Sequence, residues 1–440
     1  MMMRTFRCTA LLCGLMMMLW LGAGVASAQT VTGSVTGEVT DASGAVIPNA
    51  SVVAENVDTG VKTTATSNAS GTYSILFLPI GRYAVSATAA GFSPQTFSVF
   101  TLEIDQTVKL NAHLQVGAST SIEVNSSNAA ILNTTDATLG TTFTANTIQN
   151  LPLNGLDFSA LTLYLPGSVD TQGTSGTTSI ERSTYYTDTP NMNGNRAQAN
   201  NYTLDGIDMN ETFNNVIAYS PAPESLQEVK VLTANSPADY GNVNGGGVVS
   251  VLKSGTNKFH GSVYGYDQNQ RFNANSWQNK NATPIIPKGE YSQAQFGGTF
   301  GGPILHDKLF FFVDYLGSRY HTGGTGQATV LTQAMRNGDF SVLLNQASPI
   351  QLYDSENNFA PYAGNKGIPV LNPVATFLFA NPALYPLPNA TPTDGIAANN
   401  LQGFTKSFKA NNQGDVKIEY DPRDKDHITA FYSISTAYDG

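Results

Sequence analysis

Hydrophobic and polar residues alternate along the early part of the chain in short runs, which turn-forming Gly, Pro, Asn and Asp residues separate. The turns recur about every eight to twelve residues, a spacing typical of a β-sandwich. We therefore predict seven short strands that form one small sandwich over residues 29–117. The predicted strands are residues 35–40, 51–55, 61–66, 72–77, 82–88, 96–100 and 106–114.

A second kind of alternation begins after residue 255. In residues 416–421 (VKIEYD) three apolar side chains alternate with three charged ones. A transmembrane β-strand with one face toward lipid and the other toward the barrel lumen requires this pattern. We predict the first strands of an antiparallel transmembrane β-barrel within residues 256–440. The other predicted strands are residues 259–267, 293–300, 309–316 and 427–436.

The connections between these barrel strands alternate in length. Residues 268–291 and 317–412 are long connections, whereas 303–307 and 421–426 are short. Outer-membrane barrels have short periplasmic turns and long external loops. This order predicts that residues 317–412 lie outside the cell and that the parts before the barrel lie in the periplasm. A soluble β-sandwich with irregular loops does not predict such an alternation.

Between these two parts, residues 118–255 are rich in Asn, Thr, Gly and Ser, and the alternation is weak. The informative segments are NNYTLDGID at 200–208, SLQEVKV at 225–231 and GGGVVSVLKSGTN at 245–257. The three glycines alone indicate little, because no strand-to-helix phosphate-binding context surrounds them.

The first part resembles the carboxypeptidase regulatory-like domain, a transthyretin-like sandwich sometimes grouped with carbohydrate-binding folds. The similarity is carried by GEVTD at 37–41, IPNASV at 47–52, GTY at 71–73, LPIGRY at 78–83 and AGF at 90–92. Asn68 stands where the family often has Asp. The aromatic residues are expected in the core rather than on a sugar-binding surface. They are Tyr73, Phe77, Tyr83 and Phe92.

The middle segments resemble the plug domain of TonB-dependent outer-membrane transporters, in the Oar-like branch that carries the sandwich in front. The resemblance implies that residues 118–255 form a compact α+β plug domain with glycine turns and polar faces. It also implies a receptor that binds an external substrate and passes it through a plugged barrel. It also implies a TonB-type energy-coupling protein as partner, which binds a short extended segment by β-augmentation. The candidate segment is Ser121, Ile122, Glu123, Val124 and Asn125. An ordinary linker or the first plug strand is an equally good interpretation of it.

The N-terminus has the features of a secretory signal peptide over residues 1–28. Arg4 and Arg7 precede an apolar run rich in Leu and Met, and Ala26 and Ala28 form an A-x-A cleavage site before Gln29. A retained membrane anchor is the alternative, but the apolar run is short for a spanning helix of about 20 residues. Both cysteines lie in this segment. The mature chain is therefore predicted to contain no cysteine.

Composition supports an exported β-protein. Only 12% of the 440 residues are charged, against about 25% in soluble proteins. Uncharged polar residues take the place of the charged ones. The formal net charge of −10 and the lack of a Lys/Arg cluster argue against nucleic acid as a partner.

No catalytic, cofactor-binding or metal-binding motif is found in the sequence. HExxH, GxSxG and P-loop patterns are absent, so we predict that the protein is not an enzyme. The acids Asp205, Asp208, Asp421, Asp424 and Asp426 lack the calcium-loop pattern. They are interpreted as solvated turn residues.

Residues 256–440 are too few for a plugged barrel of about 22 strands, each of about 9–11 residues. We expect the chain to be the N-terminal part of a longer transporter, whose partners include outer-membrane lipid and the barrel-assembly machinery. The alternative is a secreted or surface carbohydrate-binding β-protein without a pore. The substrate is not readable from the sequence, and a carbohydrate is one candidate.

Overall fold

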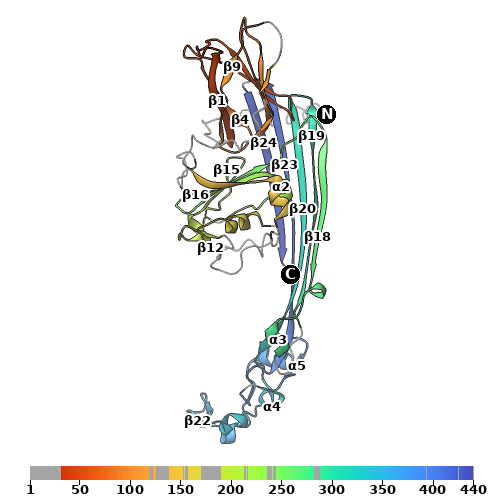
Figure 1. The fold of residues 1–440 in the computed structure, drawn as a ribbon. Helices are drawn as coiled ribbons and strands as arrows, with labels where there is room; N and C mark the ends of the chain where they lie inside the picture. The colour runs from red at the N-terminus through yellow and green to blue at the C-terminus, as the bar shows by residue number, and fades with distance from the viewer. Residues whose placement is uncertain are drawn as a thin grey trace, which may run out of the picture. The chain divides into compact units, whose positions relative to one another are not determined.

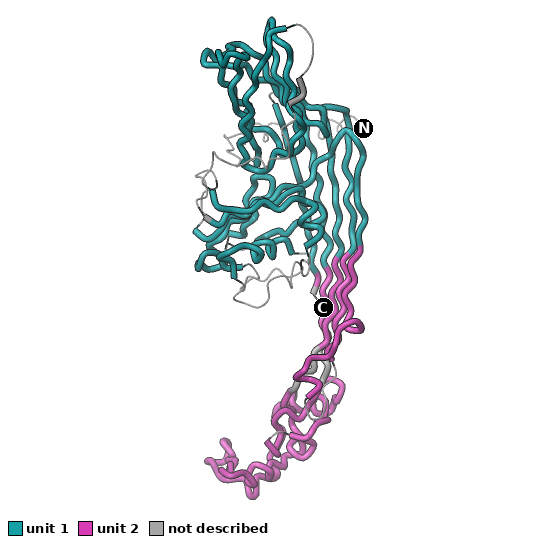
Figure 2. The backbone as a smooth tube through the Cα atoms, viewed as in Figure 1, with its two compact units in different colours: residues 1–264, 296–317, 411–437 teal, residues 265–295, 318–410, 438–440 magenta. Residues whose placement is uncertain are grey.

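The computed structural model shows a chain built mainly of β-strands (Figure 1). It forms two compact units (Figure 2). The first contains residues 1–264, 296–317 and 411–437, and the second contains 265–295, 318–410 and 438–440. The structure describes residues 31–117, 122–124, 138–151, 153, 157–169, 190–212, 215, 217–234, 240, 244–281, 288–392, 394–424 and 426–439.

The sandwich consists of two sheets that enclose one apolar core. One sheet has the order β4-β1-β8, with β9 also paired to β1, and the other has the order β10-β6-β5-β2-β3, with β7 paired to β5. Buried and exposed positions alternate along β1, β2 and β5, because successive side chains of a strand point to opposite faces. The strands are β1 (Thr32–Asp41), β2 (Ser51–Asn56), β3 (Lys62–Thr66), β4 (Thr72–Pro79), β5 (Gly81–Thr88), β6 (Gln95–Phe97), β7 (Phe100–Leu102), β8 (Thr107–Lys109), β9 (Ala112–Leu114) and β10 (Ile122–Val124).

The first five predicted sandwich strands are confirmed, but each of the last two is divided. The predicted strand 106–114 becomes β8 and β9, which pair in parallel with different parts of β1. Between them the backbone of Leu110 comes very close to Gly37, where a Cβ atom would lie 1.8 Å from the Leu110 carbonyl oxygen. A glycine is required at this position because any side chain would collide with that backbone.

The prediction that Phe77 belongs to the core is wrong. Its side chain is 67% exposed, while Tyr73 and Tyr83 are buried and Phe92 packs against the core from a partly buried position. Phe77 has a φ of 58°, and the pairing of β1 with β4 shifts register at this level. The bulge turns two successive side chains outward, so the simple alternation fails here.

The plug is an α+β domain around a five-stranded sheet with the order β11-β16-β17-β14-β15. All positions of β17 are buried, so this strand presents no face to solvent. The sheet strands are β11 (Leu139–Thr144), β14 (Asn201–Leu204), β15 (Ile207–Asp208), β16 (Leu226–Ala234) and β17 (Gly247–Leu252). Short elements complete the domain: α2 (Ala145–Asn150), η2 (Phe158–Tyr164), β12 (Ser168–Val169), β13 (Asn191–Met192), η3 (Ala197–Ala199) and η4 (Pro223–Ser225).

Five strands of the barrel wall follow and form one sheet in the order β18-β19-β20-β23-β24. All five predicted barrel strands are confirmed, and most are longer than predicted. The alternation of short and long connections is also observed. The strands are β18 (His260–Asn269), β19 (Glu290–Leu305), β20 (Leu309–Ala328), β23 (Leu401–Arg423) and β24 (Asp426–Asp439).

The second unit includes the long connection between β20 and β23, which has a small structured core of its own. The buried Arg336 side chain donates to the carbonyl oxygens of Leu331 and Tyr385, at 3.1 and 3.0 Å, and its guanidinium lies 4.5 Å from the centre of the Tyr385 ring. The elements of this unit are η6 (Gln270–Phe272), α3 (Trp277–Asn281), α4 (Gln333–Arg336), η7 (Ser341–Asn345), β21 (Tyr353–Asp354), β22 (Ala360–Pro361), η8 (Ala363–Asn365) and α5 (Pro373–Ala380).

Candidate functional site

The candidate site is the contact between the plug and the inward face of wall strand β23. Along this strand, Val416, Ile418 and Tyr420 are 41–45% exposed, and the residues between them are buried. This confirms the predicted alternation of residues 416–421. The buried inward side chains are all polar or charged. They are Asn411, Gln413, Asp415, Lys417 and Glu419.

Lys417 is the centre of a buried charge cluster. Its ammonium group lies 3.2 Å from a carboxylate oxygen of Asp205, in the plug, and 3.5 Å from Glu419 on its own strand. It also donates to the Leu252 carbonyl oxygen at 3.3 Å. All three charged side chains are at most 10% exposed. A buried lysine is stable in its charged form only with such partners.

The plug positions Asp205 through its own backbone. Asp205 lies in the turn between β14 and β15 with a φ of 47°, a conformation that Asp tolerates better than most residues. Its amide donates to the Ser250 carbonyl oxygen at 2.9 Å, and its carboxylate accepts from the Leu252 amide at 3.2 Å. Burial raises the pKa of Asp205, while the charge of Lys417 opposes this shift.

Further along β23, the Tyr219 hydroxyl and the Ser220 carbonyl group of the plug form hydrogen bonds with this wall strand. The Tyr219 hydroxyl donates to Asp415 at 2.8 Å, and the Gln413 amide donates to the Ser220 carbonyl oxygen at 3.0 Å. Burial, followed by the charge of Asp415, raises the pKa of Tyr219. Phe431 of β24 adds an apolar contact to the plug core. We call the inward face of β23 that contacts the plug (Asn411, Gln413, Asp415, Lys417 and Glu419) the seat of the plug. This seat is mainly polar.

The plug and wall are also joined to the sandwich at one end of β17. The amide of Asn257 donates to the Asp58 carbonyl oxygen at 2.9 Å. Its side chain donates to the Thr59 carbonyl oxygen at 2.7 Å and to Asp307 at 2.6 Å. Asp307 lies in the short turn between β19 and β20, so one asparagine connects the sandwich turn, the plug end and the wall turn.

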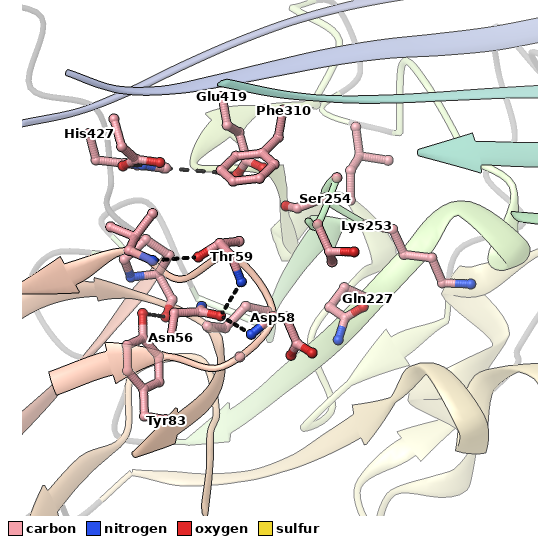
Figure 3. Close-up of a pocket in the computed structure, with 18 of the residues that line it drawn as sticks. Asn56, Asp58, Thr59, Tyr83, Gln227, Lys253, Ser254, Phe310, Glu419 and His427 are labelled. Carbon is pink, nitrogen blue, oxygen red and sulfur yellow. Dashed lines mark hydrogen bonds and ion pairs between the residues drawn. The ribbon is translucent and has the colours of Figure 1, made fainter. Parts of the chain in front are cut away.

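A cavity of about 660 Å³ lies beside this junction. Figure 3 shows Asp58 and Thr59 of the sandwich on one side of it and Glu419 and His427 of the wall on the other. His427 lies 2.7 Å from Asp421. The cavity lining carries several carboxylates, but within the described ranges no group of three His, Cys, Asp or Glu side chains is placed to hold a metal ion.

The interpretation of the acids as solvated turn residues is wrong for Asp205 and Asp421. Asp205 is buried against Lys417, and the Asp421 side chain is 11% exposed and bonded to His427. Asp208 is exposed, as expected. Local sequence could not show this burial, because the partner of Asp205 is more than two hundred residues away in the chain.

Three residues of the candidate coupling segment are described. Ile122, Glu123 and Val124 form β10, which pairs in parallel with β6 of the sandwich. This segment is therefore an edge strand of the sandwich and not the first strand of the plug sheet, which is β11. Ser121 and Asn125 lie outside the described residues, as does the predicted cleavage site at Ala26, Ala28 and Gln29.

In the part of the chain that the structure describes, no helix is long and apolar enough to span a membrane.

Three family models match successive parts of the chain. The carboxypeptidase regulatory-like domain matches residues 34–115, the TonB-dependent receptor plug domain matches 142–248, and an outer membrane β-barrel domain matches 251–439. The TonB-dependent transporter Oar of Myxococcus xanthus is 27% identical over 273 residues, which are 57% of this chain and 23% of that protein. The chain thus spans about a quarter of that relative's length.

Two similar solved structures are a ferric enterobactin receptor of Pseudomonas aeruginosa and the outer membrane transporter YddB of Escherichia coli. The first is 12% identical with a TM-score of 0.36, covering 69% of this chain and 34% of the receptor. The second is 14% identical with a TM-score of 0.37, covering 68% and 33%.

The order of the three domains, the matched residues and the Oar relative agree with the fold described above. They place the chain in the outer membrane, with its N-terminal domains on the periplasmic side. The three matched domains, together with the Oar relative, support an Oar-like TonB-dependent receptor.

Proposed function

We propose that the complete protein binds a substrate outside the cell and passes it through the barrel when a TonB-type protein pulls on the plug. The observation that carries this proposal is the polar seat of the plug on β23, centred on Lys417 and Asp205. A transport plug must stay in place at rest and still leave its seat when pulled.

A polar seat fits both requirements. The hydrogen bonds of Tyr219 and Gln413 to their partners hold the plug in one position. When the plug moves, water replaces these partners, so the neutral Gln413–Ser220 bond costs about 0.5–1.5 kcal/mol and the bond of Tyr219 to the Asp415 carboxylate about 1.5–3 kcal/mol. An apolar seat would cost about 25 cal/mol for every Å² exposed. The contact between the plug and its seat therefore fixes the position of the plug and can form again after the plug has left.

The segment from Ser121 to Asn125 is our candidate for the strand that TonB takes up. Its central residues Ile122–Val124 are extended and occupy a sheet edge, where they pair with only three residues of β6. TonB would bind them by adding them to its own sheet through main-chain hydrogen bonds. Such binding requires that β10 first leave β6.

The remaining partners follow from the same proposal. The full protein would be inserted by the barrel-assembly machinery into outer-membrane lipid. Its external substrate is unknown, with a carbohydrate as one candidate, and nucleic acid is not expected. We propose no enzymatic activity. The secreted carbohydrate-binding alternative is less favoured, because the plug and outer-membrane β-barrel family models both match the chain.

Replacing Val124 tests the coupling strand. Proline removes a backbone donor and fixes φ, so Val124→Pro should abolish capture of the full-length protein by an immobilised periplasmic domain of TonB. Val124→Ala keeps the backbone donor and should leave capture nearly unchanged. Normal heat-modifiable migration of both variants would show that the barrel is intact. Capture of the proline variant at the wild-type level would show that the coupling strand lies elsewhere.

A further inference from the structure

The plug sheet has a second face that points away from the main plug core. Val229, Val231 and Val248 face that core, and the alternate residues of β16 and β17 form the second face. These are Glu228, Lys230, Leu232, Val249 and Val251, and all are at most 8% exposed. A sheet face with three aliphatic side chains needs a cover to exclude water.

Tyr240 of the plug covers part of this face, and the sandwich covers it through Val31, Ile80 and a turn between β7 and β8, residues 103–106. The Ile104 side chain is 1% exposed and belongs to one apolar cluster with Leu232, Val249 and Val251 of the second face. It is not part of the sandwich core. Ile104 therefore projects from the sandwich and packs against the second face of the plug sheet.

Charged side chains of the second face bind the backbone of the same residue. A carboxylate oxygen of Glu228 accepts from the Ile104 amide at 2.6 Å, and the Lys230 ammonium donates to the Ile104 carbonyl oxygen at 3.2 Å. Lys230 also lies 3.4 Å from Asp105. Side chains of the plug therefore bind both main-chain polar groups of Ile104.

The conformation of the 103–106 turn is held by hydrogen bonds within the sandwich itself. Asp105 has a φ of 60°, and its amide donates to the Thr32 carbonyl oxygen at 3.1 Å. The Glu103 amide donates to the Gln106 side chain at 3.0 Å. Since these bonds lie within the sandwich, little conformational entropy is lost when the turn docks.

We infer that the second face is a docking surface for the sandwich's own 103–106 turn, strong enough to hold the sandwich on the plug without their covalent connection. The inference does not depend on transport. It combines a central buried apolar anchor with charged groups that recognise the surrounding backbone, the arrangement found at the energetic centre of stable interfaces. The sandwich would then travel with the plug whenever the plug moves.

A protease site inserted within residues 126–137 of the full-length protein tests this inference. After cleavage in isolated outer membranes, the wild-type sandwich should stay with the membrane through repeated washing. Ile104→Asp places a carboxylate among apolar side chains beside Glu228, and burial of an unpaired charge is costly. We expect this variant to release the cut sandwich at least about tenfold faster.

Val99→Asp is the matched control, since Val99 is 54% exposed on the same sandwich. It should behave like the wild type. A thermal melt of the released fragment checks that Ile104→Asp leaves the sandwich folded, as the position of Ile104 outside the sandwich core predicts. Immediate release of the wild-type sandwich, or equal retention of Ile104→Asp, would overturn the inference.

Discussion

Lys417 forms ion pairs with two carboxylates, so the three members of its cluster contribute unequally to stability. Its ammonium group lies 3.2 Å from Asp205 and 3.5 Å from Glu419. Without Lys417, both carboxylates are left close together in a buried site. Without Asp205, Lys417 still has Glu419. The energetic cost of substitution should therefore depend on which member is removed.

We expect Lys417→Met to destabilise the seated plug by about 3–5 kcal/mol, the usual cost of leaving a buried charge unpaired. Asp205→Asn should cost clearly less, because the remaining ion pair is intact. Hydrogen exchange of plug strands β14 and β17 during a urea titration of the full-length protein measures the difference. Glu356→Gln, in the exposed part of the second unit, is the control. A larger loss in Asp205→Asn than in Lys417→Met would contradict this description of the seat.

The cluster could not be predicted from local sequence. The motif LDGID resembles an exposed turn, and Asp205 does lie in a turn. Its burial depends on a strand that begins almost two hundred residues later. In contrast, the inward direction of Lys417 was predictable, because VKIEYD alternates strictly. The pattern predicts the face on which a side chain lies, but not the group that it meets there.

At the scale of elements, regular alternation predicted strand position well and failed where the backbone departs from regular pleating. The sandwich strands β1 to β5 and the five wall strands were predictable. The bulge at Phe77 and the divided strand around Leu110 were not, because each depends on a close backbone contact with β1. The contact of β16 with the 103–106 turn was also not predictable. Glu228 and Lys230 alternate with valines along this strand, a pattern that resembles a strand with one solvated face.

The docking of the 103–106 turn on β16 should depend on pH. Burial raises the pKa of Glu228 to about 7, with Glu103 raising it further and the Ile104 amide and Lys230 opposing the shift. The docked state therefore binds this proton more tightly than the separated state, where the pKa returns toward about 4.3. Docking should strengthen as pH falls from about 7 toward 4.3 and be weakest above 7.

The release rate of the cut sandwich measures this dependence. From pH 8 to pH 5.5, release should slow in the wild type, with Glu103, Asp105 and Lys230 as the other charged groups at the contact. Glu228→Gln can still accept from the Ile104 amide but cannot titrate, so its release should change much less over this range. Faster release at pH 5.5 than at pH 8 in the wild type would show that the sign is wrong.

At the scale of the whole molecule, the order of the three domains was predictable from sequence. Sandwich motifs, plug motifs and alternating wall strands follow one another, and the three matched families follow the same order. The contacts between the domains were not predictable, because they join residues far apart in the chain. Asn257, Lys417 and Ile104 each connect two or more parts, and no local pattern around them indicates which residues they contact.

The central claim is that this chain lies in the outer membrane with its sandwich in the periplasm and its long β20–β23 connection outside. Cysteine labelling of the full-length protein on intact cells tests it most directly. The exposed positions Asn357 and Ala69 give a matched pair, Asn357→Cys in the connection and Ala69→Cys in the sandwich. A membrane-impermeant maleimide should label Asn357→Cys on intact cells, and Ala69→Cys only after the outer membrane is permeabilised. Labelling of Ala69→Cys on intact cells, with Asn357→Cys protected, would contradict the account.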